Sequence, residues 1–236
     1  MKAFDFYEFA GILVPGAMTL TAIVLVFGFM RTTIFAPDLT VGDLGLFVVL
    51  AYAAGHLTQA IGNGVERLWW RAWQGMPSDW IRTRAHHLLG DTQLQSLPGK
   101  LASELNIHTT LDAQNLSARD WYSITRQVYA EVSAQSRNNR VDSFNGNYGL
   151  NRGIASALLI GLVLLLIVHG LAYWQIILAL IVGIVVALYR VHRFGVLYAR
   201  ELFVQFLQLR KGERGAGDTS TRSVQKNSSG RKQPEP

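Results

Sequence analysis

The chain has 236 residues, half of them hydrophobic and only 16% charged, and its mean hydropathy is +0.19, a composition typical of membrane proteins. It contains no cysteine, which excludes disulfide bonds, thiolate metal sites and cysteine nucleophiles. The formal net charge of +6 lies in residues 190–236, which hold ten Lys and Arg against four Asp and Glu, whereas residues 1–189 hold twelve of each.

The first element is a run from Phe9 to Met30 without a charged residue, long enough to span a bilayer. A secretory signal peptide is the competing interpretation. It is disfavoured because the preceding MKAFDFYE lacks a basic region and no small-residue cleavage site precedes Arg31. We therefore expect a transmembrane helix over about 9–30, with a kink or an open first turn at Pro15-Gly16 that frees backbone carbonyls.

The second run, Leu44 to Val65, predicts a second span, so that residues 1–66 form a transmembrane hairpin with spans over about 9–30 and 44–65. Its second half carries polar side chains within about 80° of one another on one helix face, namely His56, Gln59, Asn63 and Glu66. We favour interhelical hydrogen bonding for this polar stripe, including to backbone freed at Pro15-Gly16. The alternative is a polar path or ligand contact, in which His56 changes charge near neutral pH.

Residues 67–152 are expected to form a cytoplasmic and interfacial helical region. Tryptophans alternate with arginines at its start, which predicts a segment that leaves the bilayer along its surface rather than a nucleic-acid site. The residues expected at the membrane interface are Trp69, Trp70, Trp73, Arg71 and Arg152. For Arg152 a lipid phosphate is the favoured partner and Glu66 the alternative.

Short helices are expected in the polar part of this region. Pro77-Ser78-Asp79 predicts a helix that runs to Gly90, Pro98-Gly99 a second through Leu105, and Ser117 with Asp120 a capping box before a third. Roughly 75 residues in such helices can hardly bury an independent core. We therefore expect them to lean on the membrane, on a second subunit or on the C-terminal helix.

The run Gly153 to Tyr189 carries no charge and would be roughly 55 Å long as one helix, whereas a bilayer core is about 30 Å thick. It is therefore expected to fold back at His169-Gly170 into a second transmembrane hairpin, residues 153–189. Small residues recur every four positions in both arms, which predicts that the arms face each other and pack closely. These residues are Gly153, Ala157 and Gly161 in the first arm, and Ala179, Gly183 and Ala187 in the second.

The chain is expected to continue as an amphipathic cytoplasmic helix, residues 190–211, which lies on the membrane surface or docks on the polar region. Residues 212–236 are expected to be a disordered basic tail. Four spans place both termini and the polar region on one side, which holds nearly every Lys and Arg. The positive-inside rule predicts that this side is the cytoplasm, and we expect a multi-pass protein of the cell (inner) membrane.

No catalytic residue, metal site or cofactor is predicted, since no zinc-hydrolase spacing, nucleophile elbow, phosphate loop or dinucleotide fingerprint occurs. The segments YEFAG and VPGA at the start, AGHLTQAIGN in the second span and NYGLNRG before the second hairpin resemble bacterial membrane proteins. This resemblance implies no particular activity.

The sequence thus predicts an all-α integral membrane protein with four transmembrane helices in two hairpins and a small cytoplasmic helical block. We expect a non-enzymatic scaffold, effector or pore component that contacts lipids and forms a homo-oligomer or binds a membrane or cytoplasmic protein, but not nucleic acid. One alternative is a small transporter or ion-conducting protein that uses the polar stripe. The least favoured is a lipid-active enzyme, for which Asp79, His86 and His87 are the available groups.

Overall fold

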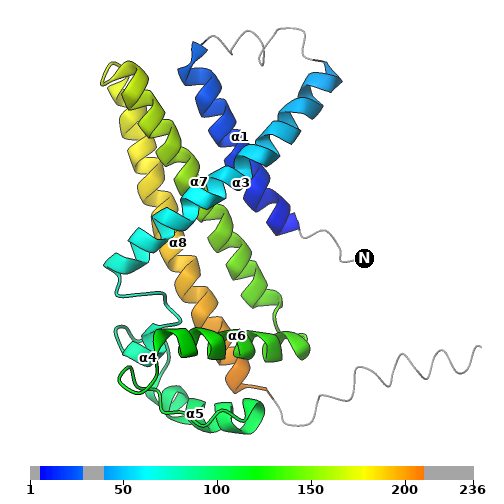
Figure 1. Ribbon diagram of the computed structural model, residues 1–236, viewed down its shortest axis with the longest axis vertical. Coiled ribbons are helices and arrows are strands. Elements are labelled where there is room, and N and C mark those ends of the chain that lie inside the picture. The colour runs from blue at the N-terminus through cyan, green and yellow to red at the C-terminus, as the bar shows by residue number, and fades with distance from the viewer. Residues whose placement is uncertain (1–5, 29–39, 210–236) are drawn as a thin grey trace, which may run out of the picture.

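The structure, a computed structural model, describes residues 6–28 and 40–209. In these ranges the chain is helical and contains no strand (Figure 1). The helices are α1 (Phe6–Val26), α3 (Val41–Ala72), α4 (Trp80–Thr83), α5 (Asp91–Leu105), α6 (Ala118–Ala134), α7 (Asn139–His169) and α8 (Trp174–Leu207). The end of the first predicted span, most of the connection after it and the basic tail lie outside the described residues.

Four helices are long and apolar enough to cross a membrane, namely α1, α3, α7 and α8. The prediction of an all-α chain with four such helices is confirmed. With 31 and 34 residues, α7 and α8 are about 46 and 51 Å long. Both exceed a bilayer core of about 30 Å, so a third or more of each helix continues beyond the apolar segment.

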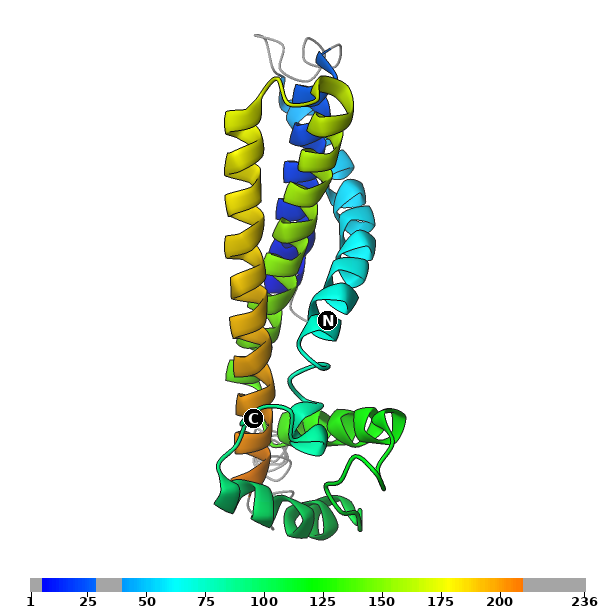
Figure 2. The ribbon, with the colours of Figure 1, turned by 90° about the vertical axis from the view of Figure 1, so that its left-hand side faces the viewer.

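Helix α7 is the centre of the four-helix arrangement and packs against α1, α3 and α8. Figure 2 shows α3 and α8 on opposite sides of α1 and α7. α1 and α3 cross at two glycines: a Cβ at Gly16 would lie 1.8 Å from the Ala51 carbonyl oxygen, and one at Gly55 would lie 2.1 Å from that of Ile12. Backbones this close explain why small residues occupy the crossing.

The two predicted small-residue runs contact different helices. A Cβ at Gly153 would lie 2.5 Å from Pro15 of α1, and one at Gly161 would lie 3.3 Å from Ala22 of α1. In contrast, the nearest atom to Gly183 belongs to Leu158 of α7, at 3.1 Å. The sequence pattern alone predicts that the runs face each other. In the structure, Gly153 and Gly161 of α7 face α1 instead.

Helix α8 continues without a break from Trp174 into a helical block, which we define as residues 76–138 with the C-terminal third of α8. The core of the block is built on α8, where Leu202, Phe203 and Phe206 are fully buried. The Phe203 ring stacks on Trp121 of α6 at 5.6 Å between ring centroids. Of the two alternatives for residues 190–211, the structure has the described part, up to residue 209, docked on the polar region as a continuation of α8, and residues 210 and 211 lie outside the described residues.

Inside the block, the end of α4 and the start of α5 differ from the positions predicted from the sequence. The helix expected from Asp79 to Gly90 ends after one turn, because Arg84 adopts a left-handed φ of 57°. The next helix begins at Asp91 rather than at Pro98, which lies inside α5. Ser117 caps α6 as predicted, since its hydroxyl accepts a hydrogen bond from the Asp120 amide at 3.1 Å.

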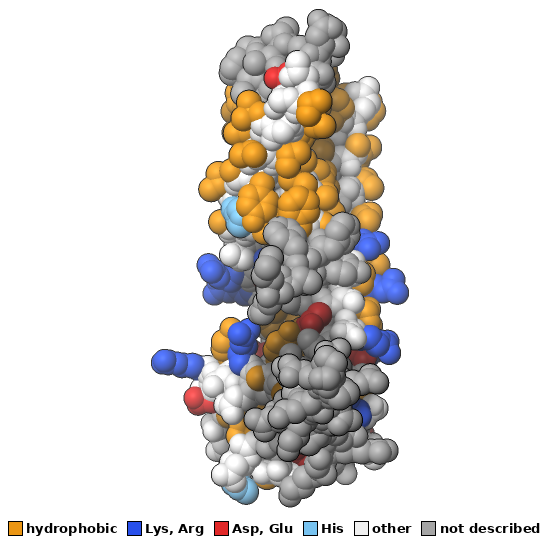
Figure 3. Space-filling model, turned by 90° about the vertical axis from the view of Figure 1, so that its right-hand side faces the viewer, with side chains coloured by type: hydrophobic (Ala, Val, Ile, Leu, Met, Phe, Trp, Pro, Cys, Tyr) orange, Lys and Arg blue, Asp and Glu red, His pale blue; other side chains and the backbone are white. Residues whose placement is uncertain are grey.

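Large apolar side chains remain exposed along α3 and α8. Figure 3 shows hydrophobic side chains over the upper part of one face, with Lys and Arg side chains below them. Soluble proteins rarely expose an apolar surface of this extent. The exposed residues include Val41, Leu44, Leu46, Val49, Leu57 and Ile61 on α3, and Ile176, Leu178, Val182, Val185 and Val186 on α8.

Candidate functional site

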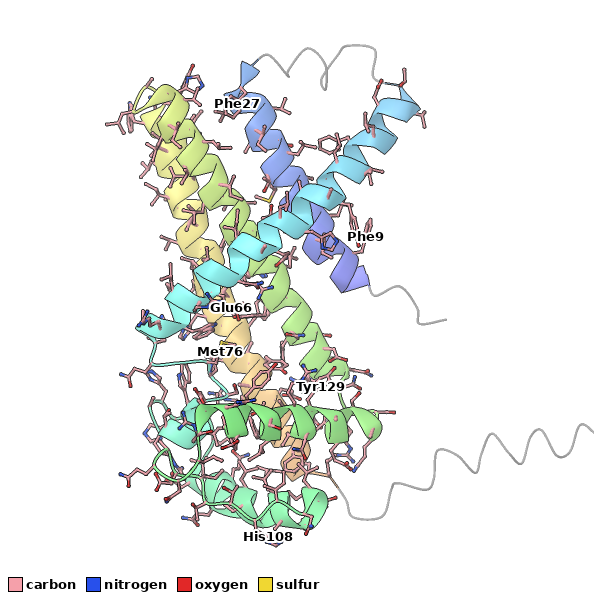
Figure 4. The ribbon with its side chains drawn as sticks, in the orientation of Figure 1. Phe9, Phe27, Glu66, Met76, His108 and Tyr129 are labelled. Atoms are coloured by element: carbon pink, nitrogen blue, oxygen red, sulfur yellow. The ribbon has the colours of Figure 1, made fainter. Side chains whose placement is uncertain are left out.

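A cleft of about 880 Å³ lies where the four long helices meet the helical block. In Figure 4, Glu66 at the end of α3, Met76 in the following loop and Tyr129 of α6 surround this region. All four residues of the predicted polar stripe line the cleft, so the stripe does share one face. The other polar lining residues are Ser78, Tyr122, Thr125, Arg126, Tyr129, Asp142, Asn145, Tyr148, Arg152 and Tyr198.

Gln59 connects α3 to α1. Its side-chain amide donates a hydrogen bond to the Gly11 carbonyl oxygen at 2.7 Å. Gly11 lies four residues before Pro15, and proline has no backbone N–H to donate to that carbonyl. Gln59 therefore supplies the donor that Pro15 lacks, which is the interhelical hydrogen bonding that we favour for this residue from the sequence.

Arg152 of α7 extends this connection to a third helix. Its guanidinium donates to the Gln59 side-chain oxygen at 3.0 Å and also forms an ion pair with Glu66. The two charged side chains are only 21% and 18% exposed. Because the pair is partly shielded from water, its attraction is stronger than that of an ordinary surface pair. Arg152 thus forms the ion pair with Glu66 that was the alternative prediction from the sequence.

The other two stripe residues are free to contact a ligand. His56 and Asn63 are both exposed and line the cleft. His56 packs edge-on against Tyr52, with ring centroids 4.8 Å apart. Neither side chain forms a hydrogen bond with any residue that the structure describes. The stripe therefore divides into a structural half, Gln59 and Glu66, and an accessible half.

The tryptophans predicted at the interface fall into different environments. Trp70 is only 3% exposed, and its indole N–H donates to the Tyr148 hydroxyl at 2.7 Å. Its ring also lies against Gly195 of α8, where a Cβ would come within 2.7 Å. Trp73 and Arg71 are exposed, while Trp69 is half-buried. Trp69, Trp70 and Arg71 lie on α3, which continues to Ala72, and Trp73 follows the helix directly.

Two histidines lie among these tryptophans. The His192 ring lies 4.5 Å from Trp73, and the His86 ring lies 4.3 Å from Trp80. The sequence does not predict these ring contacts, because the partners come from α3, the α4 region and α8, far apart along the chain. His87 and Asp79, the other groups considered for lipid chemistry, do not line the cleft.

The acids of the cleft are already engaged. Glu66 pairs with Arg152, and Asp142 accepts hydrogen bonds from the Tyr129 hydroxyl at 2.8 Å and from the Asn138 amide at 2.6 Å. Burial, followed by this bond to Asp142, raises the pKa of the Tyr129 hydroxyl above its ordinary value. Tyr129 therefore stays neutral and acts as a donor.

Several donors of the cleft, in contrast, are unengaged. Arg126, Asn63 and Asn145 line the cleft and form no hydrogen bond or ion pair with a described residue. Arg126 shares one face of α6 with Tyr122, Thr125 and Tyr129, at spacings of three and four. This row lies beside the buried face of Trp121, Ile124, Val128 and Val132, and nothing in the sequence indicates that it lines a cleft.

No group of three metal-ligating side chains occurs in the described parts of the chain. Comparison with protein-family models, curated proteins and solved structures finds no match.

Proposed function

We propose that the chain is a non-enzymatic integral membrane effector, in which an event at the cytoplasmic helical block is transmitted to four transmembrane helices. The observation that carries this proposal is the continuity of α8 from Trp174 to Leu207. One rigid helix provides both an apolar segment for the membrane and the central core residues of the block. A partner that shifts the block would therefore shift α8 in the membrane as well.

The contacts of α3 extend this coupling across the bundle. Trp70, near the end of α3, packs on Gly195 of α8 at the junction of the two parts. The Arg152–Glu66 pair joins α3 to α7 at the same level. Since interfaces of this kind have discrete arrangements rather than continuous ones, a displacement of α8 is passed to its neighbours. The proposed outcome is a change in an oligomeric assembly or pore.

The charge distribution supports a cytoplasmic location for the block and both ends of the chain. Every Lys and Arg among the described residues lies from Arg67 to Arg152 or from Arg190 to Arg200, at the block end of the molecule. The turn between α7 and α8, at the opposite end, has none. The absence of native cysteine permits a direct test with Leu171→Cys in that turn and Ser103→Cys on α5. A membrane-impermeant maleimide should label only L171C in intact cells, and labelling of S103C instead would reverse the orientation.

The coupling is tested with the full chain in dye-loaded liposomes, together with chemical crosslinking. We expect crosslinked oligomers and dye leakage, and we expect Phe203→Ala, which loosens the core of the block, to change the leakage. Gln127→Ala, on the exposed surface of α6, should leave leakage unchanged. A monomer that does not leak would contradict the effector function. Leakage unaltered by F203A, when proteolysis shows a loosened block, would contradict the coupling.

The accessible half of the polar stripe favours a second candidate function, transport of a solute or ion. His56 and Asn63 are exposed to the cleft and have no hydrogen-bond partner in the described part of the chain. Solute flux in liposomes that is lost in His56→Leu and Asn63→Leu variants would favour transport. Flux that survives both substitutions would exclude it.

A further inference from the structure

The cleft has a surplus of hydrogen-bond donors. Its carboxylates, Glu66 and Asp142, are engaged by protein groups, whereas the Arg126 guanidinium and the amide of Asn145 are unengaged among the described residues. A ligand that fits this arrangement brings negatively charged oxygen atoms. Guanidinium groups match phosphate particularly well, since their N–H groups are placed to donate two parallel hydrogen bonds.

The end of the cleft between the long helices combines the polar stripe with apolar side chains. Ile12 of α1, Ala60 of α3 and Leu150 of α7 line it, and these residues belong to helices that are long and apolar enough to span a membrane. The cleft therefore runs from the polar face of α6 to apolar side chains of α1, α3 and α7 that lie beside the polar stripe. Its volume of about 880 Å³ lies within the range of roughly 300–1,000 Å³ that holds small amphiphilic ligands.

We infer that this cleft binds an anionic phospholipid of the adjacent leaflet. Its headgroup phosphate would lie at Arg126, and part of an acyl chain would lie along Ile12 and Ala60. A membrane supplies a ligand with both properties at this position, and anionic lipids are concentrated in the cytoplasmic leaflet. The inference rests on the proposed membrane insertion but not on the proposed coupling between block and membrane.

Native mass spectrometry of the full chain in mild detergent tests the inference. Phosphatidylglycerol and phosphatidylcholine with identical acyl chains are titrated separately, and glycerol 3-phosphate is the third probe. We expect one phosphatidylglycerol to bind more tightly than phosphatidylcholine, and glycerol 3-phosphate to bind much more weakly than either. Equal affinity for the two lipids would overturn the anionic site, and equal affinity for glycerol 3-phosphate would overturn the assignment to a lipid.

A pair of arginine variants locates the headgroup. Arg126→Gln should weaken phosphatidylglycerol binding about tenfold, the value expected for the loss of one charge-assisted contact. Arg119→Gln removes the same charge from an exposed position of the same helix that does not line the cleft. The R119Q variant should bind phosphatidylglycerol as tightly as the wild type does. Equal effects of R126Q and R119Q would mean that the protein attracts the lipid by its overall charge alone.

A pair of alanine variants locates the acyl chain. Ala60→Trp fills the part of the cleft lined by α1 and α3 and should reduce lipid binding several-fold, whereas Ala53→Trp places the same side chain on an exposed part of α3 outside the cleft. Wild-type binding by A60W would overturn the position of the chain. The proposed membrane insertion fails separately, since a chain that is freely soluble without detergent would disprove it whatever the lipid affinities.

Discussion

Arg152 and Glu66, 86 residues apart in the sequence, form an ion pair that joins the middle of α7 to the last turns of α3. Arg152→Leu should leave Glu66 partly buried without a partner and remove the bond to Gln59. We expect a loss of stability on the order of 2 kcal/mol, measured by thermal unfolding in detergent with tryptophan fluorescence. The double variant R152L/E66L should recover part of this loss, because no unpaired charge remains. A single variant as stable as the wild type would show that the pair contributes nothing.

The crossing of α1 and α3 depends on Gly55. A Cβ at this position would lie 2.1 Å from the Ile12 carbonyl oxygen, so Gly55→Ala must push the helices apart. We expect a loss of about 1–3 kcal/mol, as for overpacking of a core. Gly64→Ala is the control on the same helix, since nothing lies within 4 Å of its Cβ position. G64A should keep or raise stability. A similar loss in both variants would show that α3 does not tolerate replacement of glycine by alanine at either position, so that the loss is not specific to the crossing.

The contact between Trp70 and Tyr148 is a buried hydrogen bond. Tyr148→Phe removes the acceptor and leaves the indole N–H without a partner, which should cost about 1–3 kcal/mol. Tyr122→Phe removes a hydroxyl from a side chain that is 67% exposed and should have little effect. Chemical unfolding of both variants in the same detergent measures the difference.

The helical block should depend on Phe203, which is fully buried and stacks on Trp121. Phe203→Ala should destabilise the block by about 3–5 kcal/mol. Limited proteolysis should then cut between α4 and α6 much faster than in the wild type, while α7 and the first half of α8 remain protected. Cleavage that spreads evenly along the whole chain would argue against a block with its own core.

Tyr129 should make the stability of the block depend on alkaline pH. Its raised pKa means that the folded state favours the neutral hydroxyl, so this contribution is present below the ordinary tyrosine pKa of about 10 and is lost as pH rises through the higher folded-state value. At pH 8, Tyr129→Phe should be about 1 kcal/mol less stable than the wild type, because the bond to Asp142 is missing. The difference should narrow above pH 10, and a constant difference would contradict the pKa shift.

Much of the fold is predictable from the sequence because membrane-length apolar runs are a strong local signal. The break at His169-Gly170, the cap at Ser117 and the apolar face of α6 depend on residues within a few positions of one another, and each occurs where the pattern predicts. The end of α4 was missed because Arg84 adopts a left-handed conformation that no glycine or asparagine signals. Pro98 misled the prediction of α5 for a related reason, since proline more often begins a helix than lies inside one.

The sequence predicted the residues that α3 contributes to the site but not those that α6 contributes. The helical period places His56, Gln59, Asn63 and Glu66 on one face, and the structure shows that all four line the cleft. The hydrogen bond from Gln59 to the Gly11 carbonyl oxygen could be inferred from the sequence, because Pro15 has no backbone N–H to donate to that carbonyl. The residues contributed by α6, among them Arg126 and Tyr129, could not be inferred from the sequence, because α6 meets the polar stripe only after the chain has folded.

By itself, then, the sequence determined the helical class of this protein, the number of membrane-length helices and the polar face of α3, since each follows from periodicity and local hydrophobicity. Only the tertiary structure decided which small faces touch, that Arg152 pairs with Glu66, and that α8 carries the core of the block. Those outcomes depend on the positions at which separate helices cross, and contacts between residues far apart in the chain leave no periodic trace in its sequence.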